Sequence, residues 1–135
     1  MDKPTPAQNS FHIRFAQEAD ISAILGFIHA LADYERMSDQ VIADDALLRE
    51  WIFEKKKAEV LIGEEQGFPV GMALFFHNFS TFLGRAGIYL EDLFVLPEKR
   101  GNGYGKALLE RLAAITVARG CGRLEGSCLD WSQPS

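Results

Sequence analysis

The spacing of apolar residues divides the first part of the chain into a strand and a helix. Residues 11–16 alternate between apolar and polar side chains, as a short strand does. From Ile21 to Ala32 the apolar residues recur every three or four positions, which predicts an amphipathic helix that Asp20 could cap. Residues 33–41 are mostly polar and predict a connection.

A second, shorter helix is predicted after this connection. Its apolar positions share one helical face, and they are Leu47, Leu48, Trp51 and Ile52. Residues 55–57 are all lysine and lie near the C-terminal end of this helix, where positive charge interacts favourably with the helix dipole.

The middle of the chain has the pattern of an antiparallel hairpin. Two apolar runs, at residues 58–65 and 68–80, are separated by Gln66 and Gly67. A short connection that contains glycine is typical of a turn between paired strands, so we expect these two runs to pair.

The remaining residues predict a strand, a helix and a last strand. The strand covers residues 87–96 and ends before Pro97, the helix covers 103–119 and ends before Gly120, and the last strand covers 123–129. The predicted order is β-α-α-β-β-β-α-β. This order indicates an α/β fold with a mixed, mostly antiparallel sheet flanked by helices, built from hairpins and one parallel crossover.

Length and composition indicate a single globular domain. A chain of 135 residues supports one hydrophobic core, which we place at residues 11–135 after a flexible tail at residues 1–10. With 47% hydrophobic and 24% charged residues, the chain is neither disordered nor fibrous in composition. It has no apolar run long enough to cross a membrane and no signal-peptide pattern, so a cytoplasmic location is expected.

The distribution of charge favours a small cationic partner. The formal net charge is −5, and acidic side chains predominate up to residue 96, whereas basic ones predominate after it. Several acids cluster after the first predicted helix, namely Asp33, Glu35, Asp39, Asp44 and Asp45. Such a cluster attracts cations, although a merely solvated acidic face has the same pattern. Nucleic acid is an unfavourable partner, because the chain has no basic stripe to neutralise phosphates.

Neither the cysteines nor the histidines have the spacing of a metal site. Cys121 and Cys128 lie seven residues apart in a predicted strand, beyond the reach of a disulfide, so we expect free thiols. His12, His29 and His77 are scattered along the chain. We therefore expect no metal.

A glycine-rich turn between the strand at 87–96 and the helix at 103–119 is the strongest candidate for a ligand site. Glycine lets the main chain approach a ligand closely, and the free N–H groups of a first helical turn bind phosphate. Arg100 and Lys106 add positive charge on both sides. A plain turn is the simplest alternative. A Walker A loop and a dinucleotide fingerprint are disfavoured, because Ala107 follows Lys106 and no glycine stands at position 106.

Two further segments complete a resemblance. Residues 89–95 read YLEDLFV, residues 100–105 have the form R-x-x-G-x-G, and residues 31–35 read LADYE. The R-x-x-G-x-G pattern, preceded by YLEDLFV, resembles the acetyl-CoA-binding motif of the GNAT N-acetyltransferases, and the resemblance covers residues 11–135. YLEDLFV and LADYE are similar to segments of the diamine (spermidine/spermine or thialysine) acetyltransferase branch. The resemblance implies acetyl-CoA as cosubstrate. It also implies that main-chain groups of Leu93, Phe94 and Val95 hold the pantetheine, and that Arg100, Gly101, Asn102, Gly103, Tyr104, Gly105 and Lys106 hold the pyrophosphate.

Acetyl transfer to an amine requires a base, because an alkylamine near neutral pH is almost wholly protonated. Glu91 and Asp92 stand in an otherwise apolar strand, and strand alternation predicts that they face opposite sides of the sheet. The resemblance favours Glu91 as the base, acting through water, and as an attraction for the cationic substrate. It implies that Tyr34 and Glu35 bind the far end of the amine. The alternatives are structural ion pairs for the two strand acids, a packing role for Tyr34 and a solvated Glu35.

The chain departs from the family near its C-terminus. Ser132 stands where the family has asparagine, and the sequence stops at Ser135, before the helix that carries a proton-donating tyrosine and before two further strands. We therefore expect a C-terminally incomplete domain and an intermolecular contact, most simply a homodimer, at the edge of the 123–129 strand. The predicted function is acetyl transfer to a primary amine of a small cation. An acyl-CoA-binding or regulatory module and an enzyme that acetylates protein N-termini are the alternatives.

Overall fold

The computed structural model describes residues 10–127, and over these residues the predicted order of elements is confirmed. The strands are β1 (Phe11–Phe15), β2 (Glu59–Glu65), β3 (Phe68–Ser80), β4 (Arg85–Val95) and β5 (Leu124–Glu125). The helices are α2 (Ile21–Tyr34), α3 (Asp45–Leu48) and α4 (Tyr104–Ala118). Short 3-10 turns, η1 (Glu18–Asp20), η2 (Ser38–Gln40) and η4 (Pro97–Lys99), and a π-helical segment, η3 (Arg49–Glu54), connect them.

The strands form one mixed sheet in the order β1-β2-β3-β4-β5. The first three pairings are antiparallel, and β5 joins β4 in parallel after the crossover through α4. The pairing of β4 with β5 is short, because it joins only Ile88 to Leu124 and Tyr89 to Glu125. The remainder of β4, towards its C-terminal end, therefore has β3 as its only strand neighbour among the described residues.

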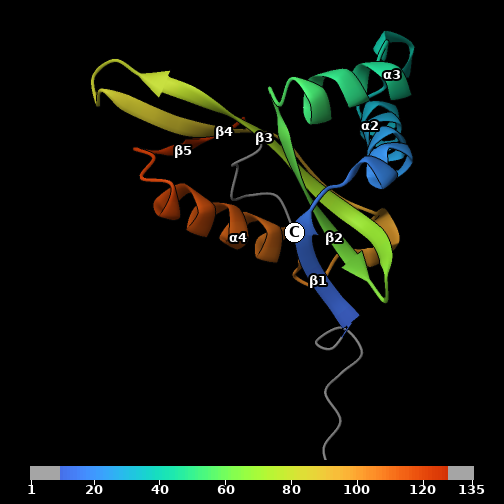
Figure 1. Cartoon of the computed structure of the whole chain (residues 1–135). Coiled ribbons are helices and arrows are strands. Elements are labelled where there is room, and N and C mark those ends of the chain that lie inside the picture. The colour runs from blue at the N-terminus through green and yellow to red at the C-terminus, as the bar shows by residue number, and fades with distance from the viewer. Residues whose placement is uncertain (1–9, 128–135) are drawn as a thin grey trace, which may run out of the picture.

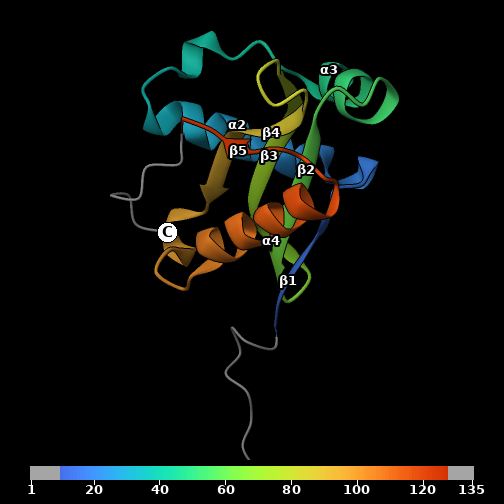
Figure 2. The ribbon, with the colours of Figure 1, turned by 90° about the vertical axis from the view of Figure 1, so that its left-hand side faces the viewer.

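Helices cover the two faces of the sheet separately. Helix α4 runs across one face, and α2 and α3 lie on the other (Figures 1 and 2). The core under α4 contains Leu108 and Leu112 of the helix against Phe75, Ile88 and Leu90 of the sheet. A second core under α2 and α3 contains, among others, Ile21, Ile24, Phe27, Leu48, Ile52, Met72 and Phe94. We refer below to the α4 face and the α2 face of the sheet.

The hairpin predicted around Gln66 and Gly67 is confirmed, with β2 and β3 paired in antiparallel register. Both turn residues have positive φ, 52° for Gln66 and 84° for Gly67. Two consecutive residues of this kind form the tight turn whose twist matches that of paired strands.

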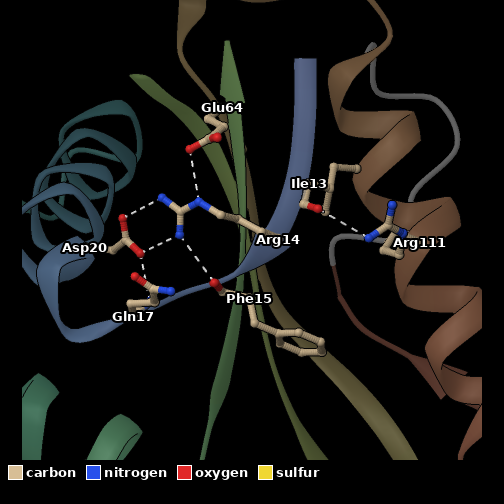
Figure 3. A network of polar contacts seen from close by, with 7 residues as sticks. All are labelled: Ile13, Arg14, Phe15, Gln17, Asp20, Glu64 and Arg111. Carbon is tan, nitrogen blue, oxygen red and sulfur yellow. Dashed lines mark hydrogen bonds and ion pairs between the residues drawn. The ribbon is translucent and has the colours of Figure 1, made fainter. Parts of the chain in front are cut away.

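A partly buried polar network joins β1, η1 and β2 at one edge of the sheet (Figure 3). The Arg14 guanidinium donates to Asp20 Oδ2 (2.7 Å) and Oδ1 (2.9 Å), and its Nε donates to Glu64 Oε2 (3.0 Å). Asp20 also accepts the Gln17 N–H at 2.7 Å. The prediction that Asp20 caps α2 is wrong, because its carboxylate makes no side-chain bond to that helix and instead closes η1 and binds Arg14. The hydrogen bond from Arg14 is the main reason why the pKa of Asp20 lies below its usual value.

Two other details of the predicted helices differ in the structure. Tyr34 is the last residue of α2 rather than part of the connection. Leu48 and Ile52 are buried as predicted, but Leu47 and Trp51 are 39% and 45% exposed. The π-helical geometry of residues 49–54 widens the turn beyond 3.6 residues, so four positions that would share a face of an α-helix no longer do so.

Some predictions concern residues outside the described range. These are the tail up to residue 9, the strand beyond residue 127, and Cys128, Ser132 and the chain end. Cys121 is described and is a free thiol. None of the helices between residues 10 and 127 combines the length and the apolar character that a membrane span requires.

Candidate active site

Strand β4 contains a bulge at Glu91. Leu90 pairs with Phe75 of β3 and Asp92 pairs with Leu74, so Glu91 is an extra residue without a partner. A bulge breaks the alternation of side chains between the two faces of a strand.

The bulge brings Glu91 and Asp92 to the same face. Tyr89 stacks on Phe76 on the α2 face, with ring centroids 5.3 Å apart, and alternation from Tyr89 places Glu91 on this face. Phe94 packs into the α2 core, and alternation back from Phe94 places Asp92 there as well. The prediction that the two acids face opposite sides is therefore wrong, because an extra residue resets the alternation.

A third carboxylate, Glu35 at the end of α2, lies close to this pair. Burial, together with the negative charges of Glu91 and Glu35, raises the pKa of Asp92 to about 6, and burial is the largest of these causes. Glu91 and Glu35 are exposed, and Asp92 is half-buried. No ion pair between residues 10 and 127 involves any of the three. Glu91 and Asp92 therefore do not form structural ion pairs with any residue of this range, which was the alternative. Together with Glu35 they form an anionic site without a bound cation.

Tyr34 stands beside this anionic site and next to the glycine loop. Tyr34 is 74% exposed, so it is not a core residue. The Arg100 guanidinium lies 5.7 Å from the Tyr34 ring centroid and 5.8 Å from that of Phe94. The structure therefore brings the predicted amine-binding residues and the predicted pyrophosphate loop together through Arg100.

Within residues 10–127, no strand pairs with the C-terminal half of β4 along the edge that faces away from β3. The Leu96 N–H donates to Val70 O (2.9 Å), which makes these two residues a hydrogen-bonded pair of the antiparallel ladder. Bonded and non-bonded pairs alternate, so Leu93 and Val95 direct their main-chain groups away from β3, whereas Phe94 bonds to Met72. Of the three residues predicted to offer main-chain groups, only Leu93 and Val95 do so on the open edge. The Val95 carbonyl accepts from Arg100 Nε (3.1 Å) on that edge.

The glycine loop has the main-chain geometry that the sequence suggests. Gly101 and Gly103 have φ of 87° and 79°, and a Cβ added at either would meet no atom within 4 Å. The first main-chain bond of α4 runs from the Ala107 N–H to Gly103 O (2.9 Å). The N–H groups of the first helical turn, at Tyr104, Gly105 and Lys106, therefore precede the intrahelical bonds and are free for an anion.

Side chains hold this loop in place without using those N–H groups. Asn102 Nδ2 donates to the Lys99 carbonyl (2.9 Å), so its amide serves the loop itself. Lys99 Nζ lies 2.5 Å from Glu65 Oε1, and the Tyr104 hydroxyl donates to Glu65 Oε2. Burial together with this bond raises the pKa of Tyr104 to about 12. The Tyr104 phenol is therefore a structural group and is not available as a proton donor.

Reasoning from sequence missed Asp92 as a member of the site and missed Glu65 altogether. Two consecutive acids in an apolar strand could have indicated a bulge, since a bulge places both beside solvent on one face. Nothing in the spacing indicates Glu65, because its partners Lys99 and Tyr104 are distant in the sequence.

Within residues 10–127, the last strand is parallel and pairs with β4 at two residues only, and it follows a helix whose first turn carries free N–H groups. Residues 20–135 match the Acetyltransferase (GNAT) family, and the chain belongs to this family. It is an acyltransferase, and its family uses acetyl-CoA as cosubstrate.

Individual relatives agree with this membership. The chain is 41% identical over 130 residues to the thialysine N-epsilon-acetyltransferase of Bos taurus, which covers 90% of this chain and 76% of that protein. It is 26% identical to an L-ornithine N5-acetyltransferase of Arabidopsis thaliana, over 96% of this chain and 77% of the relative. An aminoglycoside acetyltransferase from an uncultured soil metagenomic sample, solved with sisomicin, shares the fold with a TM-score of 0.77 at 17% identity, over 93% and 82% of the two chains.

Proposed function

We propose that this chain transfers the acetyl group of acetyl-CoA to a primary amine of a small cationic substrate, such as a diamine, a polyamine or a lysine analogue. The observation that carries the proposal is the anionic site of Glu35, Glu91 and Asp92 beside an open strand edge and a glycine loop. The relatives named above act on thialysine and on L-ornithine, both of which carry a side-chain amine. Homodimeric assembly and a cytoplasmic location stay predictions from the sequence.

Two segments would hold acetyl-CoA: the C-terminal half of β4, and the glycine loop with the first turn of α4. Leu93 extends its N–H and carbonyl, and Val95 its N–H, to the pantetheine in the manner of an added strand, while the Val95 carbonyl is bound by Arg100. The N–H groups from Gly101 to Lys106 receive the diphosphate, with positive charge from Arg100 and Lys106. Acetyl-CoA supplies an activated thioester. Because Phe94 bonds to β3, the N–H that polarises the thioester carbonyl comes from Leu93 or Val95 rather than from Phe94.

The anionic site prepares the amine. Its negative charges attract the ammonium group, and Glu91 removes one proton, directly or through a water molecule. The neutral nitrogen then bonds to the acetyl carbon, the carbon–sulfur bond breaks, and CoA leaves as a thiolate. The nitrogen gives up a second proton as it becomes an amide, and protonation of the thiolate balances the reaction. Asp92, whose pKa is about 6, is charged at neutral pH and adds to the attraction, while Tyr34 and Glu35 contact the far end of the substrate.

A thiol-release assay with acetyl-CoA across a panel of amines tests the proposal. We expect turnover with diamines, polyamines or lysine analogues, and little with neutral peptide N-termini. Absence of turnover with every amine, combined with retained binding of acetyl-CoA, would favour the non-catalytic acyl-CoA-binding alternative.

Two glycine variants test the diphosphate site through their binding of acetyl-CoA. Gly103→Ala and Gly84→Ala each put a side chain at a positive φ, 79° and 69°, with open space around the new Cβ. Both should lose similar stability, about 1 kcal/mol. Only Gly103→Ala should weaken acetyl-CoA binding, because only that Cβ enters the space assigned to the diphosphate. Equal binding by the two variants would contradict this assignment.

A further inference from the structure

We infer that Glu65 is a positioning residue for the diphosphate loop, because its carboxylate holds both ends of the segment from Lys99 to Tyr104. Oε1 pairs with Lys99 Nζ at 2.5 Å, before the glycines, and Oε2 accepts the hydroxyl of Tyr104, after them. Glu65 lies at the end of β2, on a different hairpin from the loop that it holds. This inference deepens the proposed function and rests on it, since the loop is the proposed diphosphate site.

The Tyr104 contact to Glu65 is fixed by packing beneath it. The Tyr104 side chain is buried, and its ring stacks on that of Phe11, with centroids 3.9 Å apart and planes 2° from parallel. Gly63 leaves the space for Phe11, because a Cβ at that position would lie 2.8 Å from the Phe11 ring. The direction of the Tyr104 hydroxyl is therefore set by β1 and β2, and Glu65 meets it there.

The ties between Glu65 and the loop use only side-chain atoms of Lys99 and Tyr104. They leave the main-chain N–H groups of the glycines and of the first turn of α4 free to face an anion. A loop that is already ordered loses less conformational entropy when it binds, so a fixed loop binds more tightly than a mobile one. Glu65 therefore orders the loop and leaves the main-chain N–H groups that would bind the diphosphate unoccupied.

The same contact determines which cations face the ligand. Lys99 is paired with Glu65, and this pairing together with the Tyr104 hydrogen bond holds the pKa of Glu65 below its usual value. The counter-charge for a diphosphate is then left to Arg100 and Lys106, whose side chains form no ion pair within residues 10–127. Loss of Glu65 would free Lys99 but release the loop, and we expect the second effect to dominate.

The neighbouring residue provides a matched control. Glu64 pairs with Arg14 at 3.0 Å, and the side-chain exposures of this pair, 34% and 19%, equal those of Lys99 and Glu65. Adjacent strand residues point to opposite faces, so Glu64 faces the Arg14 network on the α2 face, away from Tyr104. Glu64→Gln therefore removes a comparable ion pair without touching the loop.

The experiment compares CoA binding by calorimetry, and steady-state kinetics, for the wild-type chain, Glu65→Gln and Glu64→Gln. We expect Glu65→Gln to weaken CoA binding and raise KM for acetyl-CoA about tenfold, the combined effect of weakening both contacts, with kcat at saturation nearly unchanged. Turnover of S-acetylpantetheine, which lacks the diphosphate, should be unaffected. Glu64→Gln should lower the melting temperature but should change neither the Kd for CoA nor the KM for acetyl-CoA.

Two single-contact variants cover the case in which Glu65→Gln does not fold. Lys99→Met and Tyr104→Phe each remove one of the two contacts, and Tyr104→Phe keeps the stacked ring. Each should weaken CoA binding by roughly threefold. If Glu65→Gln, or both single-contact variants in its place, binds CoA like the wild-type chain, the role of Glu65 is wrong while the proposed function stands. If the wild-type chain itself fails to bind CoA, the proposed diphosphate site is wrong, and the role of Glu65 is wrong with it.

Discussion

Two groups of carboxylates lie on the α2 face of the sheet, and they differ in whether a cation accompanies them. Asp20 and Glu64 share the guanidinium of Arg14 (Figure 3). Glu91 and Asp92 have no basic partner within residues 10–127 and lie close to a further acid. The pKa of Asp20 is lowered chiefly by the hydrogen bond from Arg14, whereas burial raises that of Asp92 to about 6.

The difference separates carboxylates that stabilise the fold from carboxylates that are held ready for a ligand. A partly buried acid without a partner destabilises the folded state. Such acids are typical of functional sites, where a cationic ligand can supply the missing partner. In this chain the bulge at Glu91 gathers the unpaired acids, and Arg14 binds the paired ones. Variants that replace one carboxylate of either group by an amide of the same shape test this difference.

The largest expected effect is on catalysis. Glu91→Gln should lower kcat by about 10²- to 10⁴-fold, the usual contribution of a general base, because the amide cannot accept the proton of the ammonium. Thermal unfolding should be unchanged, since Glu91 is exposed and unpaired among the described residues. Glu110→Gln, an equally exposed acid on α4, is the control and should leave kcat unchanged. Wild-type kcat in Glu91→Gln would remove Glu91 from the mechanism.

The next largest effect is on stability. Asp20→Asn should destabilise the chain by about 2 kcal/mol, because it leaves the Arg14 charge partly buried with one acid fewer. The pKa of Asp20 is lowered by folding, so this contribution is present above the unfolded value, near 4, and is lost as the pH falls through the folded value. Denaturant unfolding at pH 7 and pH 3 measures it.

Glu18→Gln is the matched control for Asp20→Asn. Glu18 lies in the same turn, η1, but its ion pair with Arg49 is exposed, and its loss should change stability by less than about 0.5 kcal/mol. The kcat of correctly folded Asp20→Asn should equal that of the wild-type chain. A large loss of kcat would mean that the paired acids also belong to the site.

Most of the fold could be predicted from the sequence because its elements follow local rules. The two apolar runs on either side of Gln66 and Gly67 are sufficient for the β2–β3 hairpin, and the glycines at 101 and 103 together with the amphipathic pattern after them are sufficient for the loop and α4. The candidate loop could be located for the same reason. Its free N–H groups are a property of any helix start.

The features that could not be predicted depend on pairings between distant residues. The bulge at Glu91 arises from the register with β3; the two consecutive acids are compatible with a bulge, but only the pairing with β3 shows that Asp92 turns to the same face. Glu65 meets Lys99 and Tyr104 only because β2 ends beside the loop. Asp20 stands in a capping position by sequence, but it binds Arg14, whose guanidinium also binds the distant Glu64 of β2.

A third variant separates stability from activity within the anionic site. Asp92→Asn should stabilise the chain at pH 7.5 by on the order of 1 to 2 kcal/mol, because the charged form of a half-buried acid with raised pKa is unfavourable in the folded state. The folded chain holds this proton up to about pH 6 and the unfolded chain loses it near 3.8, so the stability of the wild-type chain falls as pH rises across this interval. The difference between the variant and the wild-type chain should therefore vanish below pH 4.

Activity gives the second readout for Asp92→Asn. The variant should have a higher KM for the amine, since one attracting charge is lost. A variant that is less stable than the wild-type chain at pH 7.5 would show that Asp92 has a stabilising partner, and the contrast with Asp20 would then fail.

The smallest effect is expected from Glu35, which is exposed and therefore screened by solvent. Glu35→Gln should raise KM for a dicationic amine about two- to fivefold, the effect of one exposed ion pair, and should change KM for a monocationic amine less. Added salt should reduce the difference, because screening weakens exposed charges first. Asp39→Asn, another exposed acid of the same acidic cluster, is the control and should change neither constant. If both variants raise KM equally, the cluster acts through its total charge alone, and Glu35 contacts no particular part of the substrate.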